Sequence, residues 1–377
     1  MRPRESMAVL WLCLLAAMSA VAAADGAGGT SPEPAPAPPA AASDALPASA
    51  APAVPKMPAG KPITARALTL PGGGAEGVFM DYLACDRAAG RVWVPAGNTG
   101  SVDVIDAGTD KVARITGFPT AEVERRGRKR TVGPSSASVG DGVVYVGNRA
   151  NSNICTVDVK SRKIGACAVL PSMPDGVVYV ATTKEVWATT PGDASLVVLD
   201  ASKPGALTIK TSMKLEGSPE GYIVDAARGL LYTNLEDKDR TLAIDVKSRA
   251  VKATWKPECG EDGPRGLALD TALGLLFVAC TDHMAVLDTA HDGTIRSTLP
   301  MGEGVDNIDY LPSKRQLYVA AGRSGTLTVA HVADDGKLTA IASGPTAEGA
   351  RVVVADAKGG AYVADSRGGR ILYFPPM

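Results

Sequence analysis

Charged residues recur at one position of a pattern that repeats along the chain. Each lies about twelve residues before a large aromatic residue and at the start of an apolar segment. Gathered carboxylates bind cations or act as general acids and bases, and arginines stabilise negative charge on a substrate. The candidates are Asp81, Asp175, Glu220, Arg265, Asp306 and Arg351.

The aromatic residues define the repeat that must position these groups. They are Trp93, Tyr145, Trp187, Tyr232, Phe277, Tyr318 and Tyr362, separated by 52, 42, 45, 45, 41 and 44 residues. Seven units of this length predict an all-β fold, a seven-bladed β-propeller in which each unit is one four-stranded blade. A single blade cannot bury both of its faces, so neighbouring blades must stack and close a ring.

Turn chemistry supports the prediction of strands. Within a unit, apolar residues alternate with a period of two, as in residues 102–106 and 242–246. Asp106, Asp158 and Asp245 are each followed three residues later by Ser or Thr. A carboxylate at this position can accept hydrogen bonds from the amides of its own turn, so we interpret these aspartates as structural.

The two ends of the repeat array predict how the ring closes. The last unit, residues 351–374, supplies only three strands. Residues 63–70 (ITARALTL) form an isolated strand-like segment before the first unit. We expect this N-terminal strand to be the outer strand of the seventh blade, which would remove an exposed sheet edge.

The expected innermost strands share a short signature: MPDGVVYV (173–180), SPEGYIVD (218–225) and GPRGLALD (263–270). Together with the repeat length, the signature resembles the YVTN family of β-propeller repeat proteins, including YncE-like exported proteins. The resemblance covers residues 62–377. It implies a propeller with binding or scaffolding roles, and some YncE-like relatives are associated with nucleic-acid binding.

Propeller geometry directs the starts of the innermost strands toward the mouth of the central channel. One hypothesis is therefore a divalent-cation site or an acid/base pair at this mouth. The alternative is a solvated funnel whose acidic residues pair with Arg265 and Arg351. Charged residues in a pocket do not decide between the two.

A second charged feature is an insertion at residues 118–134, within the long step between the first two units. Its basic residues are Arg125, Arg126, Arg128, Lys129 and Arg130. The insertion joins a fourth strand to the next first strand, so we expect it on the same face as the channel mouth. It can bind phosphate or a nucleic-acid backbone, fold over the acidic mouth, or remain a solvated loop. No aromatic residues interleave with the arginines, which argues against stacking on single strands.

The N-terminal region predicts export. Residues 1–24 combine Arg2 and Arg4 with a short apolar run and small residues, which is typical of a secretory signal peptide. Residues 25–61 form an Ala/Pro-rich linker that we expect to be disordered. We therefore expect a periplasmic or secreted protein with no transmembrane segment after cleavage. The formal net charge of −1 favours neither nucleic acid nor membrane as a general partner.

Export permits disulfides among the remaining cysteines. Blade geometry allows two pairs, Cys155 with Cys167 and Cys259 with Cys280, although spacing alone does not establish either. Cys85 would then be left over, and we expect it to be buried and inert.

Two hypotheses from different classes follow, and the sequence does not decide whether the protein is an enzyme. The first is an exported, non-catalytic, monomeric propeller that binds a protein, polymer or anionic ligand on its top face. The second is a lactonase-like hydrolase or lyase with a cation or acid/base site at the mouth. There, Asp175, Glu220 and Asp306 would be ligands or base, and Arg265 would hold the substrate. The sequence shows no cofactor-binding motif, and the second hypothesis allows a divalent cation as the possible cofactor.

Overall fold

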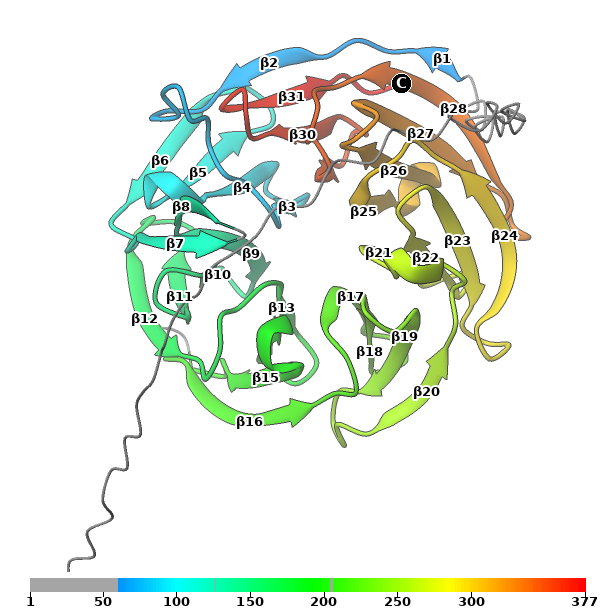
Figure 1. Cartoon of the computed structure of the whole chain (residues 1–377), viewed down its shortest axis with the longest axis horizontal. Helices are drawn as coiled ribbons and strands as arrows, with labels where there is room; N and C mark the ends of the chain where they lie inside the picture. The colour runs from blue at the N-terminus through cyan, green and yellow to red at the C-terminus, as the bar shows by residue number, and fades with distance from the viewer. Residues whose placement is uncertain (1–59, 126, 204–205) are drawn as a thin grey trace, which may run out of the picture. The chain divides into compact units, whose positions relative to one another are not determined.

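Seven mainly antiparallel sheets follow one another around a common central axis, in the order in which they occur along the chain (Figure 1). This computed structural model describes residues 60–125, 127–203 and 206–377, without the side chains of residues 125 and 128. The predicted signal peptide, the linker up to residue 59 and the side chains of Arg125, Arg126 and Arg128 lie outside the described part.

Each blade runs from an innermost strand to an outermost strand. Blade 1 contains β3 (Ala84–Asp86), β4 (Arg91–Ala96), β5 (Ser101–Asp106) and β6 (Val112–Thr116). Blade 2 contains β9 (Pro134–Gly140), β10 (Val143–Asn148), β11 (Asn153–Asp158) and β12 (Ile164–Val169). Blade 3 contains β13 (Val177–Val180), β14 (Glu185–Thr190), β15 (Ser195–Asp200) and β16 (Thr208–Lys214). Blade 4 contains β17 (Pro219–Asp225), β18 (Leu230–Leu235), β19 (Arg240–Asp245) and β20 (Val251–Trp255).

The remaining blades follow the same plan. Blade 5 contains β21 (Leu267–Asp270), β22 (Leu275–Ala279), β23 (His283–Asp288) and β24 (Thr294–Pro300). Blade 6 contains β25 (Val305–Leu311), β26 (Gln316–Ala321), β27 (Thr326–Val332) and β28 (Leu338–Pro345). Blade 7 contains β29 (Val353–Ala355), β30 (Ala361–Asp365) and β31 (Arg370–Phe374). Short 3₁₀ turns occur at η1 (Gly97–Thr99), η2 (Pro191–Asp193), η3 (Gly260–Asp262) and η4 (Pro312–Lys314).

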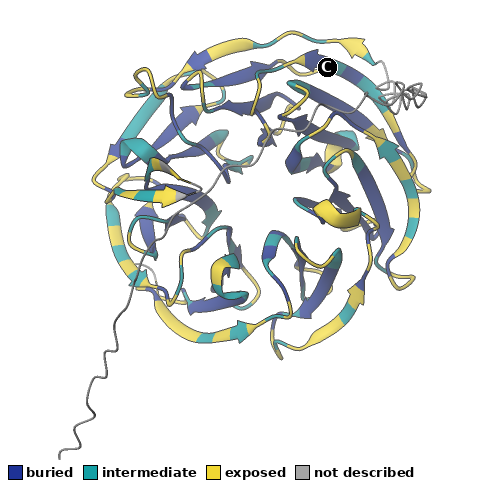
Figure 2. Cartoon of the chain, in the orientation of Figure 1, coloured by how far each residue is buried: buried dark blue, intermediate teal, exposed yellow. Residues whose placement is uncertain are grey.

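The repeated aromatic residues form the core between blades, as the spacing predicts. All seven lie on the second strand of a blade, and none exposes more than 3% of its surface. Burying one such side chain contributes about 2–3 kcal/mol to stability. The second and third strands of the blades are largely buried, whereas outermost strands such as β12 and β24 alternate partly buried and exposed residues (Figure 2).

The predicted aspartate turns are confirmed. Asp106 Oδ1 accepts a hydrogen bond from the Thr109 amide at 2.9 Å, and Asp158 Oδ1 accepts one from the Ser161 amide at 2.6 Å. The third turn, at Asp245, has the same arrangement. These carboxylates close the hairpins between the third and fourth strands.

The ring closes as predicted, through an N-terminal strand. β2 (Arg66–Thr69) pairs antiparallel with β31 and becomes the outer strand of blade 7. The structure adds one strand that the sequence did not predict: β1 (Lys61–Pro62) pairs parallel with β28 of blade 6. Lys61, assigned to the linker from composition, thus begins a strand.

Both allowed disulfides are present, Cys155–Cys167 and Cys259–Cys280. Cys85 is free and partly buried, and burial raises the pKa of its thiol to about 12. The thiol therefore stays protonated near neutral pH and is a poor nucleophile. Among the described residues, no helix is long and apolar enough to cross a membrane.

Candidate binding site at the channel mouth

The six charged residues predicted from the repeat come together at one end of the channel, which we call the mouth. Each lies at or just before the start of an innermost strand, and their side chains line two adjoining cavities. The larger, of about 1180 Å³, is bordered by Glu220, Arg265, Asp306 and Arg351. The smaller, of about 510 Å³, adds Asp81 and Asp175 and shares Glu220, Arg265 and Arg351 with the first.

Glycines that follow the charged residues explain how these strands approach one another so closely. A Cβ atom on Gly221 would lie 2.2 Å from the Arg265 carbonyl oxygen. On Gly266 it would lie 2.4 Å from the Asp306 carbonyl oxygen, which accepts the Gly266 amide hydrogen bond at 3.0 Å. Only glycine fits against backbone at such distances. The glycine of the innermost-strand signature therefore holds the charged side chains of neighbouring blades at one mouth.

Two arginines link three of the carboxylates. Arg149 donates to Asp81 Oδ2 at 2.8 Å and also to Asp175. Arg351 pairs with Asp306 at 2.9 Å and lies 3.8 Å from Asp81. Burial disfavours the charged form of Arg149, but the charges of Asp81 and Asp175 outweigh it and raise the arginine pKa. Both guanidinium groups are therefore fixed cations with partners inside the protein.

Tyr82 extends this network to Glu220. Its hydroxyl lies 3.2 Å from Asp175 Oδ2 and 3.1 Å from Glu220 Oε1. The Tyr82 ring stacks on that of Tyr222, with centroids 5.6 Å apart. One hydroxyl carries one proton, so it can donate to only one of the two carboxyl groups at a time.

The mouth favours protonated carboxyl groups. Burial, followed by the charges of Asp175 and Asp306, raises the pKa of Glu220 well above its ordinary value. Burial also raises the pKa of Asp306 to about 6 against the opposing charge of Arg351. Burial raises the pKa of Asp175 as well, although Arg149 works in the other direction. Burial removes water from these carboxyl groups, and their neighbours carry the same charge. Both effects disfavour the ionised form and raise the pKa.

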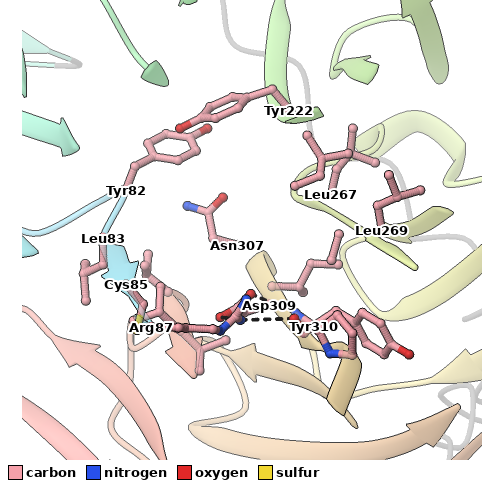
Figure 3. A pocket seen from close by; sticks show the side chains of 17 residues that line it. Tyr82, Leu83, Cys85, Arg87, Tyr222, Leu267, Leu269, Asn307, Asp309 and Tyr310 are labelled. Atoms are coloured by element: carbon pink, nitrogen blue, oxygen red, sulfur yellow. Dashed lines mark hydrogen bonds and ion pairs between the residues drawn. The ribbon is translucent and has the colours of Figure 1, made fainter. Parts of the chain in front are cut away.

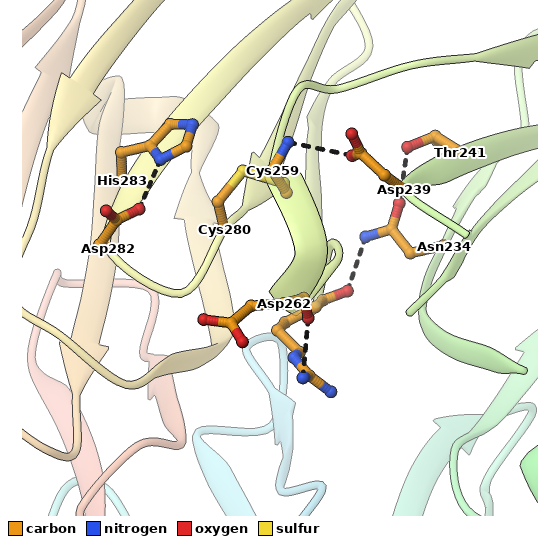
Figure 4. Close-up of a disulfide and its surroundings, with 9 residues drawn as sticks. Asn234, Asp239, Thr241, Cys259, Asp262, Cys280, Asp282 and His283 are labelled. Atoms are coloured by element: carbon orange, nitrogen blue, oxygen red, sulfur yellow. Dashed lines mark hydrogen bonds and ion pairs between the residues drawn. A yellow bond between two sulfur atoms is a disulfide. The ribbon is translucent and has the colours of Figure 1, made fainter. Parts of the chain in front are cut away.

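Arg265 forms a separate pair at the same mouth. It donates to Glu236 and, at 2.9 Å, to the carbonyl oxygen of Asp262. The disulfide at Cys259 and Cys280 joins the residue preceding the η3 turn to the end of β22, close to this contact (Figure 4). It thereby holds the turn that accepts the Arg265 hydrogen bond.

The insertion forms a two-stranded hairpin, β7 (Ala121–Arg125) and β8 (Arg128–Val132), beside the mouth. Lys129 and Arg130 line the larger cavity together with Glu220 and Asp306. Lys129 pairs with Glu122 of the same hairpin at 2.7 Å. The hairpin thus contributes two basic side chains, those of Lys129 and Arg130, to the cavity wall.

The described residues contain no group of three or more His, Cys, Asp or Glu side chains arranged to hold a metal ion. Asp81, Asp175 and Asp306 instead have arginine partners.

Sequence reasoning missed Arg149, Glu236 and Tyr82. Arg149 and Glu236 each lie four residues after a repeated aromatic residue, in the turn between the second and third strands. That spacing was available in the sequence and would have identified both. Tyr82 directly follows the mouth residue Asp81, and its two carboxyl partners come from other blades.

The opposite end of the channel holds a third cavity, of about 290 Å³, bordered by Tyr82 and Tyr222 (Figure 3). Its walls include Leu83, Leu267 and Leu269, together with one ion pair, Arg87–Asp309 at 2.7 Å. We call this the lower cavity.

Comparison with known proteins confirms the fold and goes no further. No family model and no curated protein matches the sequence. A chain from the crystal structure of the mitotic checkpoint complex is 13% identical with a TM-score of 0.67, and the match covers 89% of this chain and 97% of that one. A streptogramin B lyase is 11% identical with a TM-score of 0.64, covering 83% and 97% of the two chains. Virginiamycin B lyase from Staphylococcus aureus is 13% identical with a TM-score of 0.63, covering 84% and 100%.

Identities this low establish a shared fold alone. The matching structures number 1544 chains and include both lyases and a chain of a protein assembly, so the fold does not select a function.

Proposed function

We propose that this propeller is a non-catalytic binding protein whose channel mouth takes a segment of a protein or another polymer. The observation that carries the proposal is the cavity of about 1180 Å³ at the mouth, whose wall combines arginines and carboxyl groups from several blades. Polar groups that converge on a preformed cavity are typical of binding sites. The arginines already have internal partners, so the site is preorganised rather than assembled by the ligand.

We also propose that the protein belongs with the YVTN, YncE-like propellers and acts outside the cytoplasm. The repeat length and the innermost-strand signature support the first statement. Two disulfides support the second, because such bonds persist in oxidising compartments.

A selection experiment tests the binding proposal. A library of linear peptides is selected against the full-length protein, and the enriched peptides are measured against Thr281→Trp, which places a large side chain in the cavity wall. The matched control is Ile209→Trp, on the exposed outer strand of blade 3. We expect binding to fall at least tenfold in the first variant and to persist in the second. Enriched peptides that bind both variants equally, or no enrichment, would contradict the proposal.

An acid/base enzyme is the second candidate, and one specific observation favours it. Glu220 and Asp306 have raised pKa values in a solvent-accessible cavity, as a general acid requires. The divalent-cation form of this candidate predicts a cation-specific rise in melting temperature that Asp175→Asn and Glu220→Gln abolish. A screen of lactones and esters, with and without calcium, magnesium, manganese or zinc, distinguishes the two candidates. Turnover that Glu220→Gln abolishes would favour the enzyme.

A further inference from the structure

Glu220 differs from the other carboxylates of the mouth in its partners. Asp81, Asp175 and Asp306 each pair with Arg149 or Arg351, and Glu236 pairs with Arg265. Among the side chains that the structure describes, the Tyr82 hydroxyl is the hydrogen-bond partner of Glu220, and no Lys or Arg forms an ion pair with it. Within the described part of the chain, this carboxyl group therefore has no cationic partner, whereas the other carboxylates of the network do.

Glu220 is also accessible to a ligand. Its side chain lines both the larger and the smaller mouth cavity. It lies on β17, the innermost strand of blade 4, between Pro219 and Tyr222, which pair with Leu235 and Thr233 of β18. A group that enters either cavity can therefore reach the carboxylate without rearrangement of the strand.

The charges around Glu220 favour a positive ligand over a negative one. Four carboxylates surround it: Asp175, Asp306, Glu236 and Asp81. Arg149, Arg265 and Arg351 pair with those same four carboxylates. Together with Glu220, the carboxyl groups of this network therefore outnumber the arginines that pair with them. A cation placed beside Glu220 gains attraction to several carboxylates at once, whereas an anion there is repelled by them.

We propose that Glu220 and the Tyr82 hydroxyl receive a cationic group of the bound segment, namely a lysine ammonium, an arginine guanidinium or a free amino terminus. This inference rests on the proposed binding function and names the chemistry that the mouth recognises. A bound ammonium favours the ionised form of Glu220, and it donates to this carboxylate and to the Tyr82 oxygen, which lies 3.1 Å from Glu220 Oε1.

Three small probes test the proposal on the full-length protein at low salt. N-acetyl-lysine methylamide carries the cation, N-acetyl-norleucine methylamide has the same chain without it, and N-acetyl-glutamate methylamide carries an anion. Nuclear magnetic resonance titration gives their dissociation constants. We expect the lysine probe to bind at least tenfold more tightly than the other two.

Variants assign that preference to one carboxylate. Glu220→Gln should lower the affinity for the lysine probe at least tenfold, whereas Glu220→Asp should keep the preference for the cation. The matched control is Asp334→Asn, an exposed aspartate that pairs with Arg315, and neither residue lines either mouth cavity. Circular dichroism verifies that each variant is folded.

The outcomes separate this inference from the binding function. Equal affinity for the lysine and norleucine probes, tighter binding of the glutamate probe, or an unchanged affinity in Glu220→Gln would overturn the cation assignment. Displacement of the lysine probe by an equal concentration of calcium would also overturn it, in favour of a metal ion. Selected peptides that lack Lys and Arg but still need an open cavity would leave the binding function intact and refute this inference alone.

Discussion

The two ends of the central channel use the same kinds of residues in different ways. At the lower cavity, Arg87 donates to Asp309 at 2.7 Å and to the carbonyl oxygens of Ala355 and Tyr310 at 3.0 Å each. Asp309 also accepts the amides of Ala355 and Tyr310, at 2.7 and 2.9 Å. At the mouth, by contrast, one Tyr82 hydroxyl lies between two carboxyl groups, and Glu220 has no cationic partner among the described side chains.

This difference shows that the number of charged residues in a channel does not identify a functional site. A partly buried ion pair whose two side chains also bond to the backbone contributes to the structure, and removing one partner is costly. A carboxyl group that is desolvated and incompletely paired is unfavourable until something else binds it. We therefore assign a structural role to the lower pair and a binding role to the mouth.

The largest expected effect is on stability at the lower cavity. Asp309→Ala removes the acceptor of Arg87 and of two backbone amides, and we expect a loss of about 3 kcal/mol in the free energy of unfolding. Urea denaturation measures it. Asp334→Ala is the control, because Asp334 is 85% exposed in its pair with Arg315 and its loss should cost below about 0.5 kcal/mol. Equal effects in the two variants would remove the structural assignment.

The mouth should make stability depend on pH in an unusual direction. Asp306 has a folded-state pKa of about 6 against an ordinary 3.8, so its folded form holds the proton more tightly. Its contribution to stability is present below pH 3.8 and is lost as the pH rises through about 6. We expect the free energy of unfolding to change between pH 4 and pH 7 by about 1–3 kcal/mol less in Asp306→Asn than in wild type. Denaturation curves recorded across this pH range measure the change.

Asp288 supplies a control of opposite sign. Burial works against its ionisation, but hydrogen bonds from Arg296 and His291 outweigh it and lower the pKa to about 2. Asp288→Asn should therefore change the pH dependence below pH 4 and leave the range from 4 to 7 unaltered. If Asp306→Asn has the same pH profile as wild type between 4 and 7, the mouth is not desolvated as described.

A smaller effect on stability is expected from the Tyr82 hydroxyl, which lies between the carboxyl groups of Asp175 and Glu220. Tyr82→Phe keeps the ring that stacks on Tyr222 and removes the hydrogen bond that lowers the pKa of Asp175. We expect a cost of about 1 kcal/mol and a further rise in the pKa of Asp175. Carbon-13 resonance titration of the aspartate carboxyl groups measures the pKa. An unchanged Asp175 titration would mean that the hydroxyl donates elsewhere.

The sequence predicted the fold well because the fold depends on local, repeated features. Buried aromatics such as Trp93 recur once per blade, and Asp106 closes its turn with neighbours three residues away. Ring closure followed from counting strands. The parallel pairing of Lys61–Pro62 with β28 could not be predicted, since a two-residue strand containing proline has no alternation to detect.

The positions of the candidate site were predictable, but its pairing was not. Counting back from the aromatic residues placed Asp81, Asp175 and Glu220 at the start of innermost strands. Which carboxylate has an arginine partner depends on Arg149, a turn residue whose reach across blades appears only in three dimensions. The lower cavity was not predicted, because Arg87 and Asp309 are 222 residues apart.

One paired measurement tests the central claim, that the mouth binds and the lower cavity supports the fold. The free energy of unfolding and the dissociation constant of N-acetyl-lysine methylamide are determined for wild type, Glu220→Gln and Asp309→Ala. We predict that Glu220→Gln loses at least tenfold in affinity with stability within about 0.5 kcal/mol of wild type, because glutamine keeps the shape and a hydrogen bond to Tyr82. Asp309→Ala should lose stability and keep its affinity. A Glu220→Gln variant that is destabilised but binds the probe like wild type would contradict the account.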